Sequence, residues 1–227
     1  MKKNLYASIF LAISIFLFSC EGNDVKETSS KIRFINASSV AGDINVFIDY
    51  KKVFATDIQY LNYSLFSKHI ATTHVIQVKT AGGSTLLDTS MNFILGKTYT
   101  GILYDSMNTI KSMIYEEDFT TPKGSYCKLR FLHLSNNSPA TDISVGADTS
   151  VLFRDYVNGQ SSEYLIYGID PVYFNANYAG TSIPYYSQFS NVNLKAGNFY
   201  TIFLKGNTGS VNIDSIGIAV IENNGNY

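Results

Sequence analysis

The chain has 227 residues, a formal charge of −1 and a hydrophobic content of 45%. This composition, with only four prolines and no basic blocks, argues against extended disorder and against a nucleic-acid partner. The length suits one large or two small domains.

The first segment, residues 1–19, has the pattern of a lipoprotein signal peptide. Two lysines precede the apolar run Leu5–Phe18, which is shorter than the roughly 20 residues needed to span a bilayer. The pattern predicts cleavage before Cys20 and lipidation of that cysteine by diacylglycerol and a further acyl chain such as palmitate. Residues 1–19 hold two lysines and no acidic residue, so the mature chain has a formal charge of −3. We expect it on the outer membrane, at the cell surface or on the periplasmic face.

Residues 20–30 are predicted to form the lipidated Cys20 and a flexible tether, because Glu21–Ser30 is polar and has no apolar period. The early acidic residues resemble the surface-export signals of Bacteroidetes lipoproteins. The other cysteine, Cys127, has no disulfide partner once Cys20 is lipidated. We expect Cys127 to be a buried, unreactive thiol.

An internal repeat organises the mature chain. Three pairs of segments match in order: 31–38 with 128–135, 43–46 with 142–145, and 96–100 with 197–201. Small loop insertions between duplicated strands produce the drift in spacing. The sequence therefore predicts a first repeat at 31–118, a linker at 119–125, a second repeat at 126–223 and a tail at 224–227.

Each repeat has the pattern of β-strands separated by turns. In Asp43–Asp49, the residues Ile44, Val46 and Ile48 alternate with more polar positions, which is typical of a half-buried strand. No amphipathic helix stands out after the signal peptide. We predict an all-β chain of two tandem antiparallel β-sandwich domains of immunoglobulin-like size, which also bury surface against each other. Further strands are expected at 75–79, 98–104, 110–115, 199–205 and 213–221.

The motifs resemble those of a domain-of-unknown-function family numbered 4397, which bacterial lipoproteins carry in tandem. The resemblance rests on Lys-Ile-Arg-Phe-Ile-Asn-Ala-Ser at 31–38, the strand 43–49, Ala-Gly-Gly at 81–83 and Gly-Lys-Thr-Tyr-Thr at 96–100. Residues 126–223 look like a more divergent copy. The resemblance implies a β-sandwich on an extracytoplasmic lipoprotein, and it brings no catalytic residue.

No catalytic motif is complete in the sequence. Gly96-Lys97-Thr98 lacks the earlier glycine of a phosphate-binding loop, so we interpret it as a turn that opens a strand. His69, His74 and His133 have no zinc-ligand spacing, and packing roles are expected for them. Residues 116–118 are expected to form a charged strand end whose neighbouring side chains point to opposite faces. We therefore predict no enzyme, no catalytic residue, no cofactor and no metal site.

Scattered carboxylates leave a calcium site open as an alternative, at Asp148, Asp155 and Asp170. Tyrosine is abundant, and Tyr185 and Tyr186 follow Pro184 in a polar segment. We select this pair as an exposed ligand-binding surface for a glycan or a protein, with strand packing as the competing interpretation.

Three function classes follow from these observations. The leading prediction is a membrane-anchored, non-enzymatic binding or adhesion module for a glycan or an envelope or host protein. The alternative is a structural fibre or pilus-type subunit or an envelope assembly partner, in which proteolysis after Arg33 would free a strand position. A hydrolase whose residues meet only in the fold is the third class.

Overall fold

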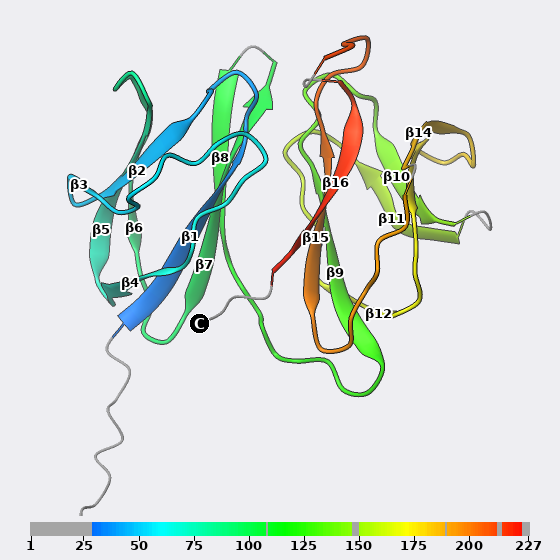
Figure 1. The fold of residues 1–227 in the computed structure, drawn as a ribbon, viewed down its shortest axis with the longest axis horizontal. Coiled ribbons are helices and arrows are strands. Elements are labelled where there is room, and N and C mark those ends of the chain that lie inside the picture. The colour runs from blue at the N-terminus through cyan, green and yellow to red at the C-terminus, as the bar shows by residue number, and fades with distance from the viewer. Residues whose placement is uncertain (1–28, 108, 147–149, 189, 213–214, 224–227) are drawn as a thin grey trace, which may run out of the picture.

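The computed structural model of the chain describes residues 29–107, 109–146, 150–188, 190–212 and 215–223. These ranges hold sixteen β-strands and no helix, and so no helix able to cross a membrane (Figure 1). The predicted signal peptide at 1–19, the tether as far as residue 28 with Cys20, and the tail at 224–227 lie outside the described residues.

The first domain consists of two four-stranded sheets. Its strands are β1 (Ser29–Ala37), β2 (Ile44–Ile48), β3 (Lys51–Lys52), β4 (Ser67–Ile70), β5 (Thr73–Thr80), β6 (Thr85–Asn92), β7 (Thr98–Ser106) and β8 (Thr109–Glu116). One sheet has the order β4-β1-β7-β8, and the other has the order β3-β2-β5-β6. The two sheets enclose an apolar core that includes Phe34, Ile44 and Ile76.

The second domain repeats this strand order. Its strands are β9 (Tyr126–His133), β10 (Thr141–Val145), β11 (Ser150–Tyr156), β12 (Leu165–Gly168), β13 (Phe174–Tyr178), β14 (Pro184–Ser187), β15 (Phe199–Lys205) and β16 (Gly217–Glu222). They form the sheets β12-β9-β15-β16 and β11-β10-β13-β14. Position by position, β9 to β16 correspond to β1 to β8.

The predicted all-β sandwich fold is confirmed, with one departure from a purely antiparallel arrangement. β1 pairs in parallel with β7, and β9 pairs in parallel with β15. The other strand pairs within the described ranges are antiparallel. A parallel pair needs a long connection, and here that connection includes all four strands of the opposite sheet and one edge strand of the same sheet.

Alternation along β2 follows the predicted pattern. In β2, Ile44, Val46 and Ile48 are buried, while Asn45 and Phe47 are half-buried. The buried side chains face the opposite sheet, as expected for a strand with one covered face. This part of the sequence prediction is confirmed.

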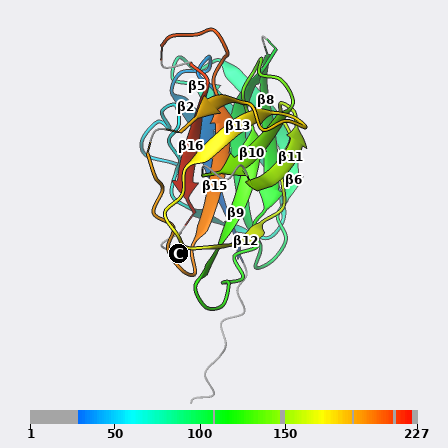
Figure 2. The same ribbon diagram turned by 90° about the vertical axis from the view of Figure 1, so that its right-hand side faces the viewer.

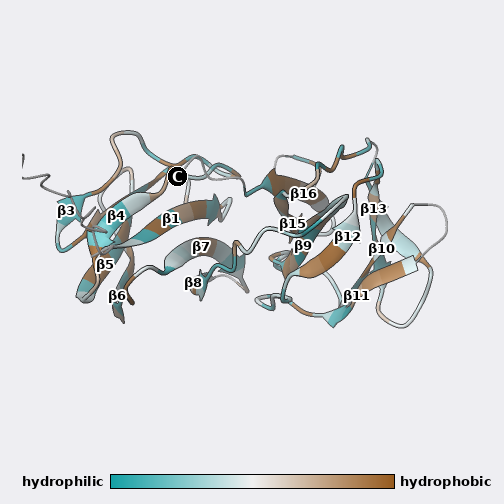
Figure 3. Ribbon diagram, turned by 90° about the horizontal axis from the view of Figure 1, so that it is seen from below, coloured by the Kyte–Doolittle hydropathy of each residue, from teal (hydrophilic) through white to brown (hydrophobic). Residues whose placement is uncertain are grey.

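The two domains pack against each other through the sheets β4-β1-β7-β8 and β12-β9-β15-β16, which we call the inner sheets. The interface core between them includes Ile35 and Ile102 of the first domain and Leu132, Phe203 and Ile221 of the second. The four sheets are stacked, so the second domain lies in front of the first in Figure 2. Hydrophobic residues mark β1 and β16 in Figure 3. The expectation that the domains bury surface against each other is confirmed.

The central strands of the inner sheets are covered on both faces, so most of their residues are buried, including polar ones. β9 is buried at every position after Tyr126, and β15 is buried from Phe199 to Leu204. β9 nevertheless carries Lys128, Arg130 and His133, and all three are buried. A polar side chain at these positions therefore needs a buried partner.

Candidate functional site

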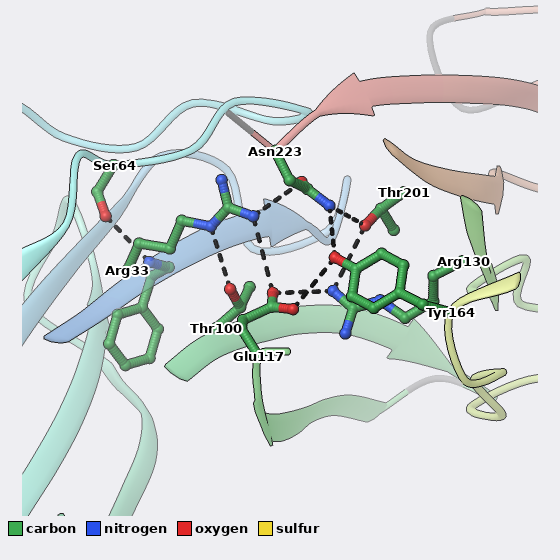
Figure 4. Close-up of polar contacts among 9 residues, drawn as sticks. Arg33, Ser64, Thr100, Glu117, Arg130, Tyr164, Thr201 and Asn223 are labelled. Atoms are coloured by element: carbon green, nitrogen blue, oxygen red, sulfur yellow. Dashed lines mark hydrogen bonds and ion pairs between the residues drawn. The ribbon is translucent and has the colours of Figure 1, made fainter. Parts of the chain in front are cut away.

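A cluster of buried polar side chains lies between the inner sheets (Figure 4). Arg33 comes from β1, and its side chain is only 2% exposed. Its Nε donates a hydrogen bond to Thr100 Oγ1 on the neighbouring β7, at 3.1 Å. Its Nη2 donates to Asn223 Oδ1, at 2.8 Å, just after β16. Arg33 thus connects the first domain to the end of the second.

The second domain makes the corresponding contact: its own arginine reaches an acceptor in the first domain. Arg130 on β9 matches Arg33 on β1, and its Nη2 donates to Glu117 Oε1 at 2.9 Å, just after β8. The same nitrogen lies 3.4 Å from Thr201 Oγ1 as a second acceptor. Glu117 Oε1 is also 3.8 Å from Nη2 of Arg33. One carboxylate therefore serves two guanidinium groups, one from each domain.

Tyr164 completes the cluster. Its hydroxyl donates to Glu117 Oε2 at 3.2 Å and accepts from Asn223 Nδ2 at 3.0 Å. Asn223 Nδ2 also donates to Thr201 Oγ1 at 2.6 Å. We call the seven residues the interface network: Arg33, Thr100, Glu117, Arg130, Tyr164, Thr201 and Asn223.

The charges of the interface network are unequal. Arg33 Cζ lies 4.9 Å from the ring centroid of Phe66, and Arg130 Cζ lies 4.7 Å from that of Tyr164. Burial lowers the pKa of Arg33. Burial acts in the same direction on Arg130, but the nearby charge of Glu117 helps to outweigh it, so the pKa of Arg130 is raised. Since arginine stays protonated in proteins, two cations share one carboxylate.

This geometry suits a structural role. Glu117 has no exposed side-chain surface, and both of its oxygens accept hydrogen bonds. Its carboxylate is therefore shielded from solvent. Because its partners come from both domains, the interface network orients the two sandwiches relative to each other.

One sequence expectation is confirmed here and one is corrected. At the predicted charged strand end, Glu117 is buried, whereas Glu116 and Asp118 are exposed. The alternation of faces along these three residues is confirmed. Arg33 is not an accessible cleavage position, because it is buried and bonded across the interface. The available signal was the arginine that recurs at the matching position of the second repeat, Arg130.

Tyr185 and Tyr186 lie on β14, and both are half-buried rather than exposed as expected. The reason is that β14 pairs with β13, so the segment is part of a sheet. Both rings pack against the second core, and the Tyr185 hydroxyl lies 2.5 Å from Thr141 Oγ1. Burial raises the pKa of Tyr185. A role of this pair in ligand binding stays a prediction.

The histidines make local packing and hydrogen-bond contacts. His74 Nδ1 lies 2.6 Å from Asp49 Oδ2, and the hydrogen bond from His74 lowers the pKa of Asp49. The His69 ring lies 5.7 Å from the His74 ring. His133 is fully buried, and burial lowers its pKa.

The described part of the chain contains no group of three or more His, Cys, Asp or Glu side chains that could hold a metal ion. Among the calcium candidates, Asp148 lies outside the described residues, and Asp155 and Asp170 do not belong to such a group. Cys127 is buried in β9, and burial raises its pKa to about 11. The prediction of a buried thiol is confirmed.

The Gly96-Lys97-Thr98 segment lines an open depression of about 580 Å³, together with Glu116–Thr120. Thr98 begins β7, so the interpretation as a turn that opens a strand is confirmed. Lys97 Nζ lies 2.5 Å from Glu116 Oε1 inside this depression. The one motif that resembled a phosphate loop therefore has its lysine paired within the protein.

A more apolar hollow of about 340 Å³ lies in the first domain, between Val53–Ile58 and Tyr63–Leu65. We call it the crossover cavity, because these segments carry the chain from one sheet to the other. β3 ends at Lys52, and the chain touches β2 again where Ile58 bridges Ile44. Between these points the edge of the sheet is irregular, and that irregularity leaves the hollow.

The second domain has a longer edge strand at the corresponding place, although its pairing with β10 contains register shifts. β11 remains in the sheet from Ser150 to Tyr156, and Phe153 is only 5% exposed in the second core. In the first domain, Phe54 lies at the margin of the core and is half-buried. The crossover cavity is therefore a local departure from the shared fold.

The crossover cavity has a lining suited to binding. Tyr63 is 47% exposed, and Phe54 and Ile58 add apolar surface. Asp57 provides a carboxylate, which accepts a hydrogen bond from Lys52 Nζ at 2.9 Å, and this contact lowers the pKa of Asp57. Thr56 adds an exposed hydroxyl. Aromatic surface beside a few polar groups is typical of ligand pockets.

A protein-family model described as "Domain of unknown function (DUF4397)" matches residues 30–144, which is just over half of the chain. The match covers the first sandwich, the linker segment and β9, and it ends in β10. The resemblance stated from the motifs is confirmed over this range. A second copy of the family domain stays a prediction.

One similar solved structure is the crystal structure of CBMbc, a family 26 carbohydrate-binding module from Eubacterium rectale Amy13K, in complex with maltoheptaose. The sequence identity is 9%, the alignment covers 87% of this chain and 98% of that chain, and the TM-score is 0.27. A score this low carries no argument about function. Among curated proteins, none matches this chain.

Proposed function

Because the chain belongs to the DUF4397 family, whose name assigns no activity, we propose a function from its own residues. The protein is a lipid-anchored, extracytoplasmic binding module without enzymatic activity. Its ligand is a glycan, which binds in the crossover cavity. The anchor is Cys20, and the location is the outer membrane, at the cell surface or on the periplasmic face.

The anchor is supported by the order of features at the N-terminus: two lysines, the apolar run Leu5–Phe18, and Cys20 followed by a polar segment. Labelling of cells with a palmitate analogue should mark the wild-type protein, and Cys20→Ser should abolish the label and release the protein from membranes. Absence of the label from the wild-type protein would contradict the proposal of a lipid anchor at Cys20. Protease treatment of intact and lysed cells then distinguishes surface from periplasmic exposure.

The crossover cavity is the observation that carries the binding function. Its volume of about 340 Å³ lies near the lower end of the roughly 300–1,000 Å³ usual for small-molecule pockets. The half-exposed Tyr63 ring offers a flat apolar surface for the C–H face of a sugar ring. Thr56 and the Asp57 carboxylate lie in the same lining and can bond hydroxyl groups.

The test is glycan-array screening of the unlipidated mature chain, residues 21–227, followed by calorimetry with any hit. Tyr63→Ala should weaken binding by about tenfold or more, since loss of one stacked aromatic ring costs on the order of 1–2 kcal/mol. Tyr126→Ala is the matched control, because Tyr126 is 51% exposed and lies outside the cavity lining. Equal affinities of the two variants would exclude this cavity as the binding site.

The pair Tyr185 and Tyr186 is the competing surface for the same ligand class. A double change of both residues to Ala should leave binding intact if the crossover cavity is the site. Circular dichroism must accompany this variant, because both rings pack against the second core. Lost binding in a folded double variant would move the site to β14.

A further inference from the structure

The first domain exposes three aliphatic side chains at the end where β1 begins. Ile70 is 71% exposed, Ile94 is 51% exposed and Leu95 is 52% exposed. Single exposed aliphatic residues are common on protein surfaces, but a group at one end of a domain is a candidate interaction surface. We call these three residues the tether-end surface.

The tether-end surface surrounds Ser29, the first described residue. Ser29 pairs with Ile70 in the ladder between β1 and β4. The carbonyl oxygen of Ser29 accepts a hydrogen bond at 3.0 Å from the Gly96 backbone N–H, and Gly96 directly follows Leu95. The tether-end surface and the start of β1 therefore occupy the same end of the molecule, at the lower end of the first domain in Figure 1.

The second domain does not repeat these three aliphatic residues at the corresponding positions, although it exposes Tyr126 and Ile166 near them. Tyr126 there takes the place of Ser29 and pairs with Gly168. The correspondence of the next loop is shown by one shared hydrogen bond: the Ile94 backbone N–H donates to Tyr99 Oη at 3.1 Å, and the Lys195 backbone N–H donates to Tyr200 Oη at 3.0 Å.

The corresponding residues in the second domain are therefore Gly168, Lys195 and Ala196. The two domains thus share the geometry of these turns, but the three positions hold aliphatic side chains in the first domain and polar or small residues in the second. The fold does not require the aliphatic residues, because the second domain forms the same turns without them.

The sequence limits how far this surface can lie from a lipid on Cys20. Eight residues, 21–28, separate Cys20 from Ser29. A fully extended segment of this length spans at most about 30 Å, and a flexible one spans about 17 Å on average. Any anchored copy therefore keeps Ser29 and its surroundings close to the bilayer.

Basic side chains flank the tether-end surface. Lys68 lies on β4, opposite Lys31 on β1, and Lys97 follows Gly96. Lys97 pairs with Glu116, so its charge is partly balanced. Aliphatic side chains with lysines at their margin match the chemistry of a bilayer surface, which offers acyl chains beneath anionic headgroups.

We propose that Ile70, Ile94 and Leu95 contact the lipid bilayer and so hold the first domain on the membrane, with the second domain beside it. This proposal rests on the anchor at Cys20 described above. The crossover cavity then lies on the membrane-bound domain. The lipid anchor and the docking face together hold that domain in a fixed orientation, which a flexible tether alone would not do.

The test uses the lipidated mature protein in vesicles of phosphatidylethanolamine and phosphatidylglycerol. A single cysteine is introduced at Leu95→Cys or, as the matched control, at Ala196→Cys, and is labelled with an environment-sensitive fluorophore. The native cysteines do not interfere, because Cys20 carries the lipid and Cys127 is buried. Bromine-labelled lipids then quench any fluorophore that enters the bilayer.

We expect the label at position 95 to shift to the blue and to be quenched several-fold more strongly than the label at position 196. Additional Ile70→Ser and Ile94→Ser changes should abolish that difference. Equal, weak quenching at both positions in vesicle-bound protein would overturn the docking proposal and leave the anchor intact. A blue shift that depends on protein density and not on brominated lipid would overturn it in favour of contact between copies. Failure of the lipidated chain to float with vesicles would overturn both the proposed anchor and the proposed docking.

Discussion

The two sandwiches share one strand order but differ where their last strands end. Glu117 follows β8 in the first domain, and Asn223 occupies the matching position after β16, as their backbone N–H groups show by donating to the first residues of β7 and β15 at 2.7 Å. Each side chain contacts the arginine of the other domain. The domains therefore exchange equivalent contacts, but only one of the two contacts is an ion pair.

This difference shows how a repeated fold forms one body. Each inner sheet carries an arginine in a strand that is buried on both faces, and neither domain alone supplies its full set of partners. Buried charges without partners are strongly unfavourable, so the arginines favour the docked arrangement over separated domains. The carboxylate of Glu117 contributes most, because it faces both guanidinium groups.

The largest effect is expected from removing that carboxylate. Glu117→Ala leaves two buried cations without a counter-charge and should lower the free energy of unfolding by about 3–5 kcal/mol. Asn223→Ala removes hydrogen bonds, including the one from Arg33, but no counter-charge, and should cost about 1–3 kcal/mol. Urea denaturation of both variants measures the difference. Equal losses would contradict the unequal roles of the two positions.

A second difference lies in the cores, where Phe34 pairs with Gly101 in the first domain and Phe131 pairs with Ile202 in the second. A Cβ at Gly101 would lie 2.5 Å from a ring carbon of Phe34. Ile202→Ala should cost about 2–5 kcal/mol by leaving a cavity, and Gly101→Ala about 1–3 kcal/mol by overpacking. Phe34→Leu combined with Gly101→Ala should recover part of that loss in thermal unfolding. A stabilised Gly101→Ala variant would contradict the close packing.

A smaller, pH-dependent difference is expected at His133, which occupies the position of Asn36 in the first domain. Burial lowers the folded-state pKa of His133 below 6.5, so at lower pH the unfolded chain binds a proton that the folded chain does not. Stability should therefore fall as the pH drops below about 6.5. His133→Asn should flatten this slope in urea titrations between pH 7 and 5, with a remainder from His69, whose pKa burial also lowers. An unchanged slope would exclude His133 as its source.

The smallest effect should come from an ion pair that flanks the linker between the domains. The Lys128 ammonium lies 2.7 Å from Asp118 Oδ2, and hydrogen bonds from Lys128 and Thr120 lower the pKa of Asp118 to about 2. A lowered carboxyl pKa stabilises the folded chain above about pH 4, and the contribution is lost as the pH falls toward 2. Asp118→Asn should remove this acid-range slope and leave the His133 range unchanged. A change between pH 7 and 5 in this variant would contradict the assignment.

Much of the fold could be predicted from local patterns, because a half-buried strand shows its faces in its alternation. Ile44, Val46 and Ile48 were assigned to one face from the sequence, and β2 follows that rule, whereas β10 is buried at every position. The parallel pairing of β1 with β7 could not be predicted, since no local signal specifies which distant strand becomes a neighbour. Tyr185 and Tyr186 were misjudged as exposed because a polar, Gly-rich segment turned out to be an edge strand.

The candidate sites depended even more on the tertiary structure. Glu117 lies between two exposed acidic residues, and nothing in that run indicates that it alone is buried between two arginines from different domains. The crossover cavity results from an edge strand that leaves its sheet after Lys52, although Phe54 and Phe153 occupy similar places in the sequence. Both features depend on contacts between segments that are far apart along the chain.

The sequence by itself determined the β-strand composition, the family resemblance of the first domain and the faces of its outer strands, because these follow from local alternation and motif. Only the tertiary structure decided that the inner sheets stack, that Arg33 and Arg130 share Glu117, and that three aliphatic side chains gather around Ser29. The physical reason is that burial of charge and clustering of exposed apolar surface are properties of neighbours in space, which a linear pattern does not contain.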